Sequence, residues 1–240
     1  DWGNRVGAWY LLDAFDALDL PLAALVNSTM YDYAPTLIAA HRQRGDEIVG
    51  HGRSNAERQG TLDEAAERAL IAEATARLAK EEGRPPQGWL GPWISHSHVT
   101  PDLLAEAGYG YLLDWCMDDQ PVQMTLDDGR TILAMPYTQQ LNDKSAIERR
   151  FVSAEGFGQM ICDQFDVLYK EGEDSGRVMA IALHPYLIGV PHRIGALDKA
   201  LKYISKHKKV WKTTGSEIAR HYLAQLNGGG SAKKKPAKKK

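Results

Sequence analysis

Short apolar runs alternate with segments of helical periodicity along most of the 240-residue chain, and this alternation limits the fold more than any other feature. Such a pattern is typical of βαβ units, in which helices cross over between parallel strands. The number of units predicts one α/β domain over residues 1–226, built on an irregular or incomplete barrel. Strands are expected at 20–26, 47–50, 88–91, 109–113, 131–135, 177–184 and 210–211, and helices at 5–18, 35–44, 62–82, 100–108, 155–171, 194–206 and 216–226.

Local signals indicate where some of these elements begin and end. Thr61 and Glu64 have the spacing of a capping box before the long helix, and Gly83 follows its last turn. The turn at 127–129, Asp-Asp-Gly, predicts a β-hairpin.

The formal net charge of −2 hides an uneven distribution. Six of the 29 basic residues are lysines between Lys233 and Lys240, and without them 23 basic residues face 31 acidic ones, a balance of −8. An acidic body argues against a specific nucleic-acid-binding protein. Residues 227–240, a Gly/Ser spacer and the lysines, are expected to be disordered. They form a solvated appendage, a nonspecific contact for anionic surfaces, or a solubility tag.

The composition also bears on the compartment. No run approaches the roughly 18 apolar residues of a membrane-spanning helix, and the amino end has no basic segment followed by an apolar one. Cys116 and Cys162 lack metal-binding or disulfide-framework spacing. We therefore expect a reduced, cytoplasmic protein that contacts no membrane.

The segment RVMAIALHPYLIGVPHR, residues 177–193, is the most informative for function. Its apolar run ends at His184, and a Pro/Gly loop is expected to carry His192 and Arg193. A buried strand with an ionisable ring at its carboxyl end is how α/β barrels present catalytic groups. A histidine that is simply hydrogen-bonded inside the fold is the alternative for His184. His192 and Arg193 are candidates for recognising a carboxylate or an imide oxygen.

Other side chains should join His184, because the carboxyl ends of parallel strands share one face. His51 lies between two glycines after a short apolar run, where a ligand can approach the backbone closely. Asp118 and Asp119 either bind amide N–H groups or are solvated loop residues. The side chains expected to converge are His51, Trp89, Asp114, Trp115 and His184.

Several motifs together resemble the polysaccharide deacetylase superfamily, most closely its branch of cofactor-independent allantoinases and cyclic-imide or amide hydrolases. They are DWGNRVG at 1–7, GDEIVGHG at 45–52, GWLGPW at 88–93, TPDLLAEAG at 100–108, DWCMDDQP at 114–121, DQFDVLYKEG at 163–172 and SGRVMAIALHPYLIG at 175–189. The resemblance spans nearly the whole ordered chain. It implies an irregular (β/α) barrel whose first strand would lie upstream of Asp1. An incomplete strand set would expose a sheet edge, which favours a homo-oligomer.

The resemblance also implies a ligand set for the metal-dependent members, an Asp and two His spaced H-x-x-x-H. His51 fits the first His, but Asn55 occupies the place of the second. Because Asn is a poor zinc ligand, we predict no metal and no other cofactor, with Asn55 contacting substrate instead. The deacetylase motif of Arg before a Pro pair is absent as well. His96 and His98 fall in a loop, where we do not expect metal binding.

Residue roles follow from the same resemblance. Leu183-His184 resembles the family's general acid, and Asp114 resembles the Asp that orients it. His51 would polarise the carbonyl or hold the attacking water. The general base is unassigned, with Asp1 and Asp118 as candidates.

Three functions are compatible with these residues. The first is metal-independent hydrolysis of a non-peptide C–N bond in a small cyclic amide, ureide or imide. The second is metal-dependent N-deacetylation of an amino sugar in a polysaccharide. The third is an inactive family member that serves as a binding module.

Overall fold

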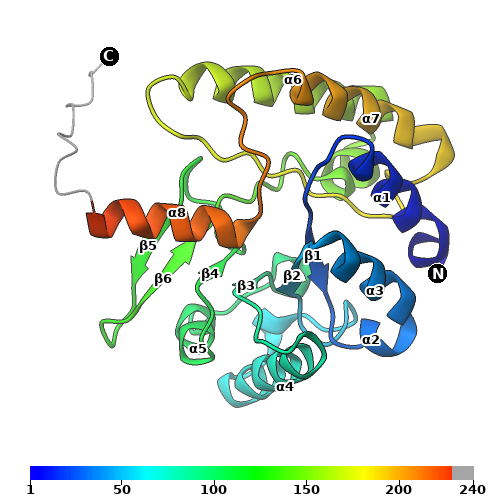
Figure 1. Ribbon diagram of the computed structural model, residues 1–240. Helices are drawn as coiled ribbons and strands as arrows, with labels where there is room; N and C mark the ends of the chain where they lie inside the picture. The colour runs from blue at the N-terminus through cyan, green and yellow to red at the C-terminus, as the bar shows by residue number, and fades with distance from the viewer. Residues whose placement is uncertain (229–240) are drawn as a thin grey trace.

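The computed structural model describes residues 1–228, and within them six strands form one sheet (Figure 1). The strand order is β1-β2-β3-β4-β6-β5; every neighbouring pair is parallel except β5 and β6, which form the predicted hairpin. The expected α/β class with a parallel sheet is therefore confirmed. The strands are β1 (Ala23–Val26), β2 (Glu47–Gly50), β3 (Gly88–Trp89), β4 (Tyr111–Leu112), β5 (Val122–Thr125) and β6 (Thr131–Ala134).

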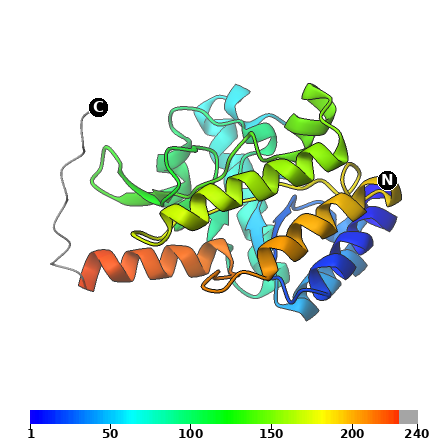
Figure 2. The same cartoon turned by 90° about the horizontal axis from the view of Figure 1, so that it is seen from above.

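Helices cover the sheet and extend beyond one edge of it (Figure 1). Helices α4 and α5 bury apolar side chains such as Leu70 and Leu104 against Trp89 and Leu112 of the sheet. Helices α6 and α7 lie side by side and enclose a second core together with α1 (Figure 2). The α-helices are α1 (Ala8–Asp16), α2 (Met30–Tyr33), α3 (Pro35–Arg44), α4 (Glu64–Glu82), α5 (Thr100–Glu106), α6 (Ala154–Glu171), α7 (Pro191–Ser205) and α8 (Gly215–Gly228), and π-helical turns cover Gly3–Gly7 and Lys144–Arg149.

The long helix α4 begins differently from the predicted capping box. Its N-cap is Asp63, whose side chain accepts a hydrogen bond of 2.8 Å from the Ala66 amide. Thr61 belongs instead to a short 3-10 turn before an extended Leu62. The expected end is confirmed, because Gly83 has φ 71°, a left-handed conformation that favours glycine.

Two predicted strands are not strands in the structure. Residues 177–184 are extended, but their only bridge in the described chain joins Ala182 to Asn142. The apolar side chains of this segment are partly buried and Ala182 is fully so, which explains the strand-like sequence, but pairing depends on a neighbour that the segment meets at one position. Residues 210 and 211 pair with no strand among residues 1–228, and Trp211 is exposed.

Two further boundaries are corrected at the carboxyl half. His192 and Arg193 lie in the first turn of α7 rather than in a loop, because Pro191 begins that helix. Helix α8 continues to Gly228, so the first two residues of the predicted linker are helical. The rest of the linker and the lysines lie outside the described residues. No helix within residues 1–228 combines the length and apolarity needed to cross a membrane.

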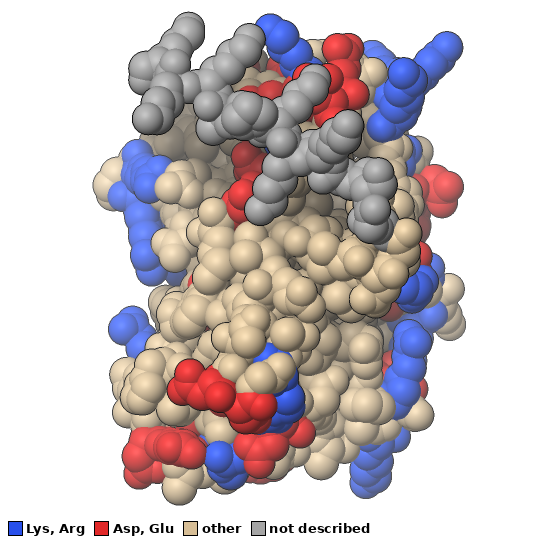
Figure 3. Space-filling view, turned by 90° about the vertical axis from the view of Figure 1, so that its left-hand side faces the viewer, with Lys and Arg blue, Asp and Glu red and all other residues tan. Residues whose placement is uncertain are grey.

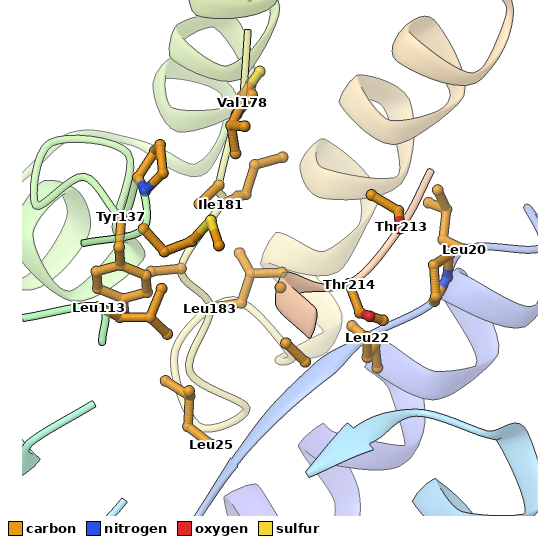
Figure 4. Close-up of a pocket in the computed structure, with 18 of the residues that line it drawn as sticks. Leu20, Leu22, Leu25, Leu113, Tyr137, Val178, Ile181, Leu183, Thr213 and Thr214 are labelled. Atoms are coloured by element: carbon orange, nitrogen blue, oxygen red, sulfur yellow. The ribbon is translucent and has the colours of Figure 1, made fainter. Parts of the chain in front are cut away.

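A cavity of about 1880 Å³ opens between β1 and the extended segment 177–184. Leu22 and Leu25 point into it from the β1 side, and Ile181 and Leu183 point into it from the extended segment (Figure 4). Tyr137 closes the side nearest β6. The cavity also reaches His51 and His184, so one space contains the apolar lining and both histidines.

Charged side chains leave the centre of one face nearly bare (Figure 3). Acidic groups gather at the lower end of this face and occur at its upper end as well, and Lys and Arg stand mainly along its sides. A nucleic-acid-binding surface would present a continuous basic stripe, and this face does not.

Candidate active site

His184 is held by Asp143 through both carboxylate oxygens. Its ring Nδ1 lies 2.6 Å from Oδ1, and its main-chain N–H donates to Oδ2 at 2.8 Å. Asp143 is completely buried, whereas the His184 side chain is about one-third exposed. Because a carboxylate only accepts, Nδ1 carries the hydrogen and Nε2 is left for chemistry in the cavity.

Main-chain pairing brings these two residues together. Asp143 N–H donates to Ala182 O at 3.1 Å, and Ala182 N–H donates to Leu141 O at 3.0 Å. The two segments thus run parallel for one bridge, which lies one residue before Asp143 in one segment and two residues before His184 in the other. A short stretch of sheet-like pairing therefore determines the geometry of the Asp–His pair.

The second histidine of the cavity, His51, follows β2 directly. Its Nδ1 lies 2.6 Å from Leu90 O, and its main-chain N–H donates to Val26 O at 3.1 Å. Because a carbonyl only accepts, Nδ1 carries the hydrogen in this ring too. Burial is the main cause that lowers the pKa of His51 to about 4; the nearby His184 acts in the same direction, and the hydrogen bond to Leu90 O opposes the shift. His51 is therefore neutral near pH 7, and its Nε2 is a hydrogen-bond acceptor.

The predicted pairing of Asp114 with His184 is wrong. Asp114 is buried, and its two carboxyl oxygens lie 2.9 and 3.1 Å from the Gly91 amide nitrogen. Burial raises the pKa of Asp114 to about 8, and the buried Glu67 carboxylate adds to this effect. Asp114 does not line the cavity, so it supports the loop after β3, while Asp143 takes the place predicted for it.

Asn55 lies at the cavity edge near His51, as the H-x-x-x-H spacing predicts. Its Oδ1 accepts a hydrogen bond of 3.1 Å from Asn27 Nδ2, and Asn27 Nδ2 also donates to His51 O. The amide oxygen of Asn55 is thus already engaged.

These side chains do not fit a metal ion. Within residues 1–228, no three His, Cys, Asp or Glu side chains come together as metal ligands would. Two His nitrogens and one amide oxygen that is already bound to Asn27 provide fewer strong donors than the three or four protein ligands of a zinc site.

Most of the other residues proposed from the sequence lie away from the cavity lining. Trp89 is fully buried in the core and donates to Gln59 Oε1 at 3.0 Å. Trp115 packs edge-on against His96, with ring centroids 5.5 Å apart. Asp1, Asp118 and Asp119 are exposed.

The remaining predicted residues stand at the start of α7. His192 is exposed, and Arg193 Nη1 donates to Leu187 O at 3.2 Å. Neither lines the cavity, so the structure brings together His184, His51 and Asn55 from the predicted set and leaves the others apart.

Among the cavity residues that the sequence prediction missed are Lys144, Tyr186 and Trp93. Lys144 Nζ donates to Tyr186 OH at 2.9 Å and lies 5.5 Å from the ring centroids of both Tyr186 and Trp93. Tyr186 also packs edge-on against His184, at 5.7 Å between centroids. The available signal for Lys144 and Tyr186 was adjacency, since they lie one residue after Asp143 and two after His184.

Comparisons with known proteins agree with this fold. No family model matches the chain. PuuE allantoinase superimposes with a TM-score of 0.87 at 33% identity, over 93% of this chain and 74% of that one. A probable polysaccharide deacetylase from Pseudomonas aeruginosa gives a TM-score of 0.86 at 33% identity, over 93% and 75%. A peptidoglycan deacetylase of Helicobacter pylori is 25% identical over 75% of this chain and 71% of its own length. The chain belongs to the polysaccharide deacetylase superfamily.

Proposed function

We propose that this protein hydrolyses a non-peptide C–N bond in a small cyclic amide, ureide or imide, without a metal ion. The observation that carries the proposal is the pair of histidines in one cavity with different partners. His51 donates to a carbonyl and is neutral, while His184 donates its Nδ1–H to a buried carboxylate. A neutral acceptor beside a second ring that a carboxylate orients is an arrangement for water attack and proton donation.

The reaction then divides between the two rings. A water held at Nε2 of His51 attacks the carbonyl carbon, and its proton passes to that nitrogen as the C–O bond forms. Nε2–H of His184 protonates the departing nitrogen as the C–N bond breaks. His51 then releases its extra proton to solvent, and His184 takes up a proton from solvent. The net reaction therefore adds one water to the amide.

The choice of substrate rests on the relatives. The similarity to an allantoinase supports a cyclic ureide, and the similarity to named deacetylases supports an N-acetyl amino sugar. In the family, N-deacetylation depends on a metal ion that one Asp and two His residues hold. We favour the cyclic substrate because Asn55 replaces a ligand and its amide oxygen is bound to Asn27.

Turnover of allantoin, dihydrouracil, succinimide and N-acetylglucosamine oligomers, each with and without a chelator, tests the proposal. We expect chelator-insensitive ring opening of a cyclic substrate that His184→Ala abolishes. Chelator-sensitive sugar deacetylation alone would replace it with the second function. No turnover, combined with binding of a cyclic ligand, would support a binding module.

A further inference from the structure

A second hollow of about 400 Å³ lies beside the main cavity. Trp93, Ile94 and Arg149 line both spaces, and Arg58, Ser95 and His96 complete the smaller one. We propose that this hollow binds a carboxylate group of the substrate, so that the preferred substrate is a cyclic amide carrying a carboxylate. The inference rests on the proposed function in so far as it calls the ligand a substrate. The binding of the carboxylate itself can be measured without turnover.

The two arginines of the hollow provide its charge. Neither Arg58 nor Arg149 forms an ion pair within residues 1–228, in contrast to Arg42, Arg53, Arg68 and other arginines that contact carboxylates. An unpaired guanidinium keeps its N–H fork available for a bidentate contact with a planar carboxylate. Two such groups lining one hollow favour an anion there.

Trp93, which lines both spaces, is held in an uncommon backbone conformation. Trp93 has φ 68° and Ile94 has φ 53°, both left-handed and neither glycine. Such backbone strain persists where surrounding contacts impose it, and it is concentrated at binding sites. Here Trp93 Nε1 donates to Asn55 O at 2.8 Å, and the Arg58 guanidinium lies over the ring at 5.0 Å from its centroid.

Lys144, the lysine over the Trp93 ring on the main-cavity side, is already neutralised. Lys144 Nζ lies 3.0 and 3.1 Å from the two carboxylate oxygens of Glu148. The Glu148 charge is thus engaged as well, which leaves the two arginines as the unpaired charges near Trp93. In addition, Nδ1 of His96 is buried with no hydrogen-bond partner in the described chain.

The hollow and the main cavity share three lining residues, so the carboxylate site lies next to the cavity that contains both histidines. A ligand with an amide ring beside His51 and His184 can extend past Trp93 to Arg149. A neutral ring would fill only the main cavity and would leave the arginines solvated. The carboxylate therefore contributes to the affinity for the substrate, so we expect it to lower KM and to leave kcat nearly unchanged.

A matched pair of probes tests the site by titration calorimetry: hydantoin-5-acetate carries the carboxylate, and 5-methylhydantoin lacks it. We expect hydantoin-5-acetate to bind the full chain at least 10-fold more tightly, as one charge-assisted contact provides. Arg149→Met and Arg58→Met should each remove most of that preference. Arg150→Met is the control, because Arg150, like Arg58 and Arg149, is exposed and forms no ion pair in residues 1–228, but it lines neither space.

The outcomes separate the two proposals. Equal affinity for both probes, no binding of either, or an equal loss in Arg150→Met would overturn the carboxylate site. Selective binding with no turnover of any cyclic substrate would leave the site in place and refute the proposed function. Where turnover occurs, Arg149→Met should raise KM for the carboxylated ring about 10-fold with little change in kcat.

Discussion

Asp143 contacts His184 at two points, with Oδ1 on the ring Nδ1 and Oδ2 on the main-chain N–H of the same residue. One buried carboxylate thus fixes both the position of the backbone and the rotation of the ring. The arrangement selects the tautomer with hydrogen on Nδ1 and directs Nε2 away from the carboxylate.

The first prediction concerns Asp143→Asn. An amide has one acceptor oxygen, so it can satisfy the ring or the main chain of His184 but not both. We expect kcat on a cyclic amide to fall about 10²- to 10⁴-fold, the range for loss of general acid–base catalysis, with KM little changed. Steady-state kinetics measure both constants. Asp114→Asn is the matched control and should retain kcat within a few-fold; an equal loss in both variants would contradict the assignment.

The second prediction concerns stability at mildly acidic pH. Burial lowers the pKa of His51 from 6.5 to about 4, so between these values the unfolded chain binds a proton there and the folded chain does not. The free energy of unfolding therefore falls as pH decreases from 6.5 to 4, and this loss is absent above 6.5. His51→Gln removes it. Urea unfolding at pH 7.5, 6.0 and 5.0 should show wild type losing more stability than the variant, whereas parallel losses would contradict the shift.

The third prediction has the opposite sign. Because burial raises the pKa of Asp114 from 3.8 to about 8, the folded chain holds a proton there that the unfolded chain releases. The free energy of unfolding contributed by this group falls as pH rises from 4 to 8. Asp114→Asn mimics the neutral carboxyl group, so its stability relative to wild type should increase from pH 5 to pH 8.5. A relative stability that is flat or decreasing over this range would refute a protonated Asp114.

The fourth prediction concerns the packing of the turn that follows His184. A Cβ on the buried Gly189 would lie 2.5 Å from Pro185 O and 2.6 Å from Gly7 O, so main-chain atoms would have to move. We expect Gly189→Ala to lower the free energy of unfolding by about 1–3 kcal/mol. Gly195→Ala is the control, because that Cβ in α7 meets no atom within 4 Å. It should be neutral or stabilising by up to about 1 kcal/mol. Chemical denaturation compares the two.

Elements with strong local signals were predictable from the sequence. The helix Pro35–Arg44 and the strand Glu47–Gly50 occur with the expected bounds, since proline begins the helix and apolar residues form the short strand. The hairpin between β5 and β6 follows from its Asp-Gly turn. Segment 177–184 shows the limit: its apolar side chains face the core and the cavity and are mostly half-buried, but strand pairing depends on a tertiary neighbour.

The site was predictable only in part. His51 and His184 follow apolar runs, and the structure places both in one cavity, as the rule for parallel strands implies. The hydrogen-bond partners of the two histidines, in contrast, were not predictable from the sequence. Asp143 lies 41 residues before His184 and follows no predicted strand, so no local pattern distinguishes it from Asp114. The backbone carbonyl that fixes the His51 ring, Leu90 O, has no signature in the side-chain sequence.

The single bridge between Asn142 and Ala182 within residues 1–228 divides the chain near the site into two stretches. The short stretch from Ala182 to His184 tolerates changes in length poorly, and the long connection from Asp143 to Ile181 tolerates them well. Side chains alternate in an extended segment, so removing one residue between Ala182 and His184 would turn the imidazole away from Asp143. Helix α6 and the turn at 172–175 supply the long connection between the two halves of the pair, and that exposed turn can absorb additional residues without altering the bridge. Evolution and protein engineering can therefore insert whole segments at this turn, while the two residues leading to His184 are confined to one length.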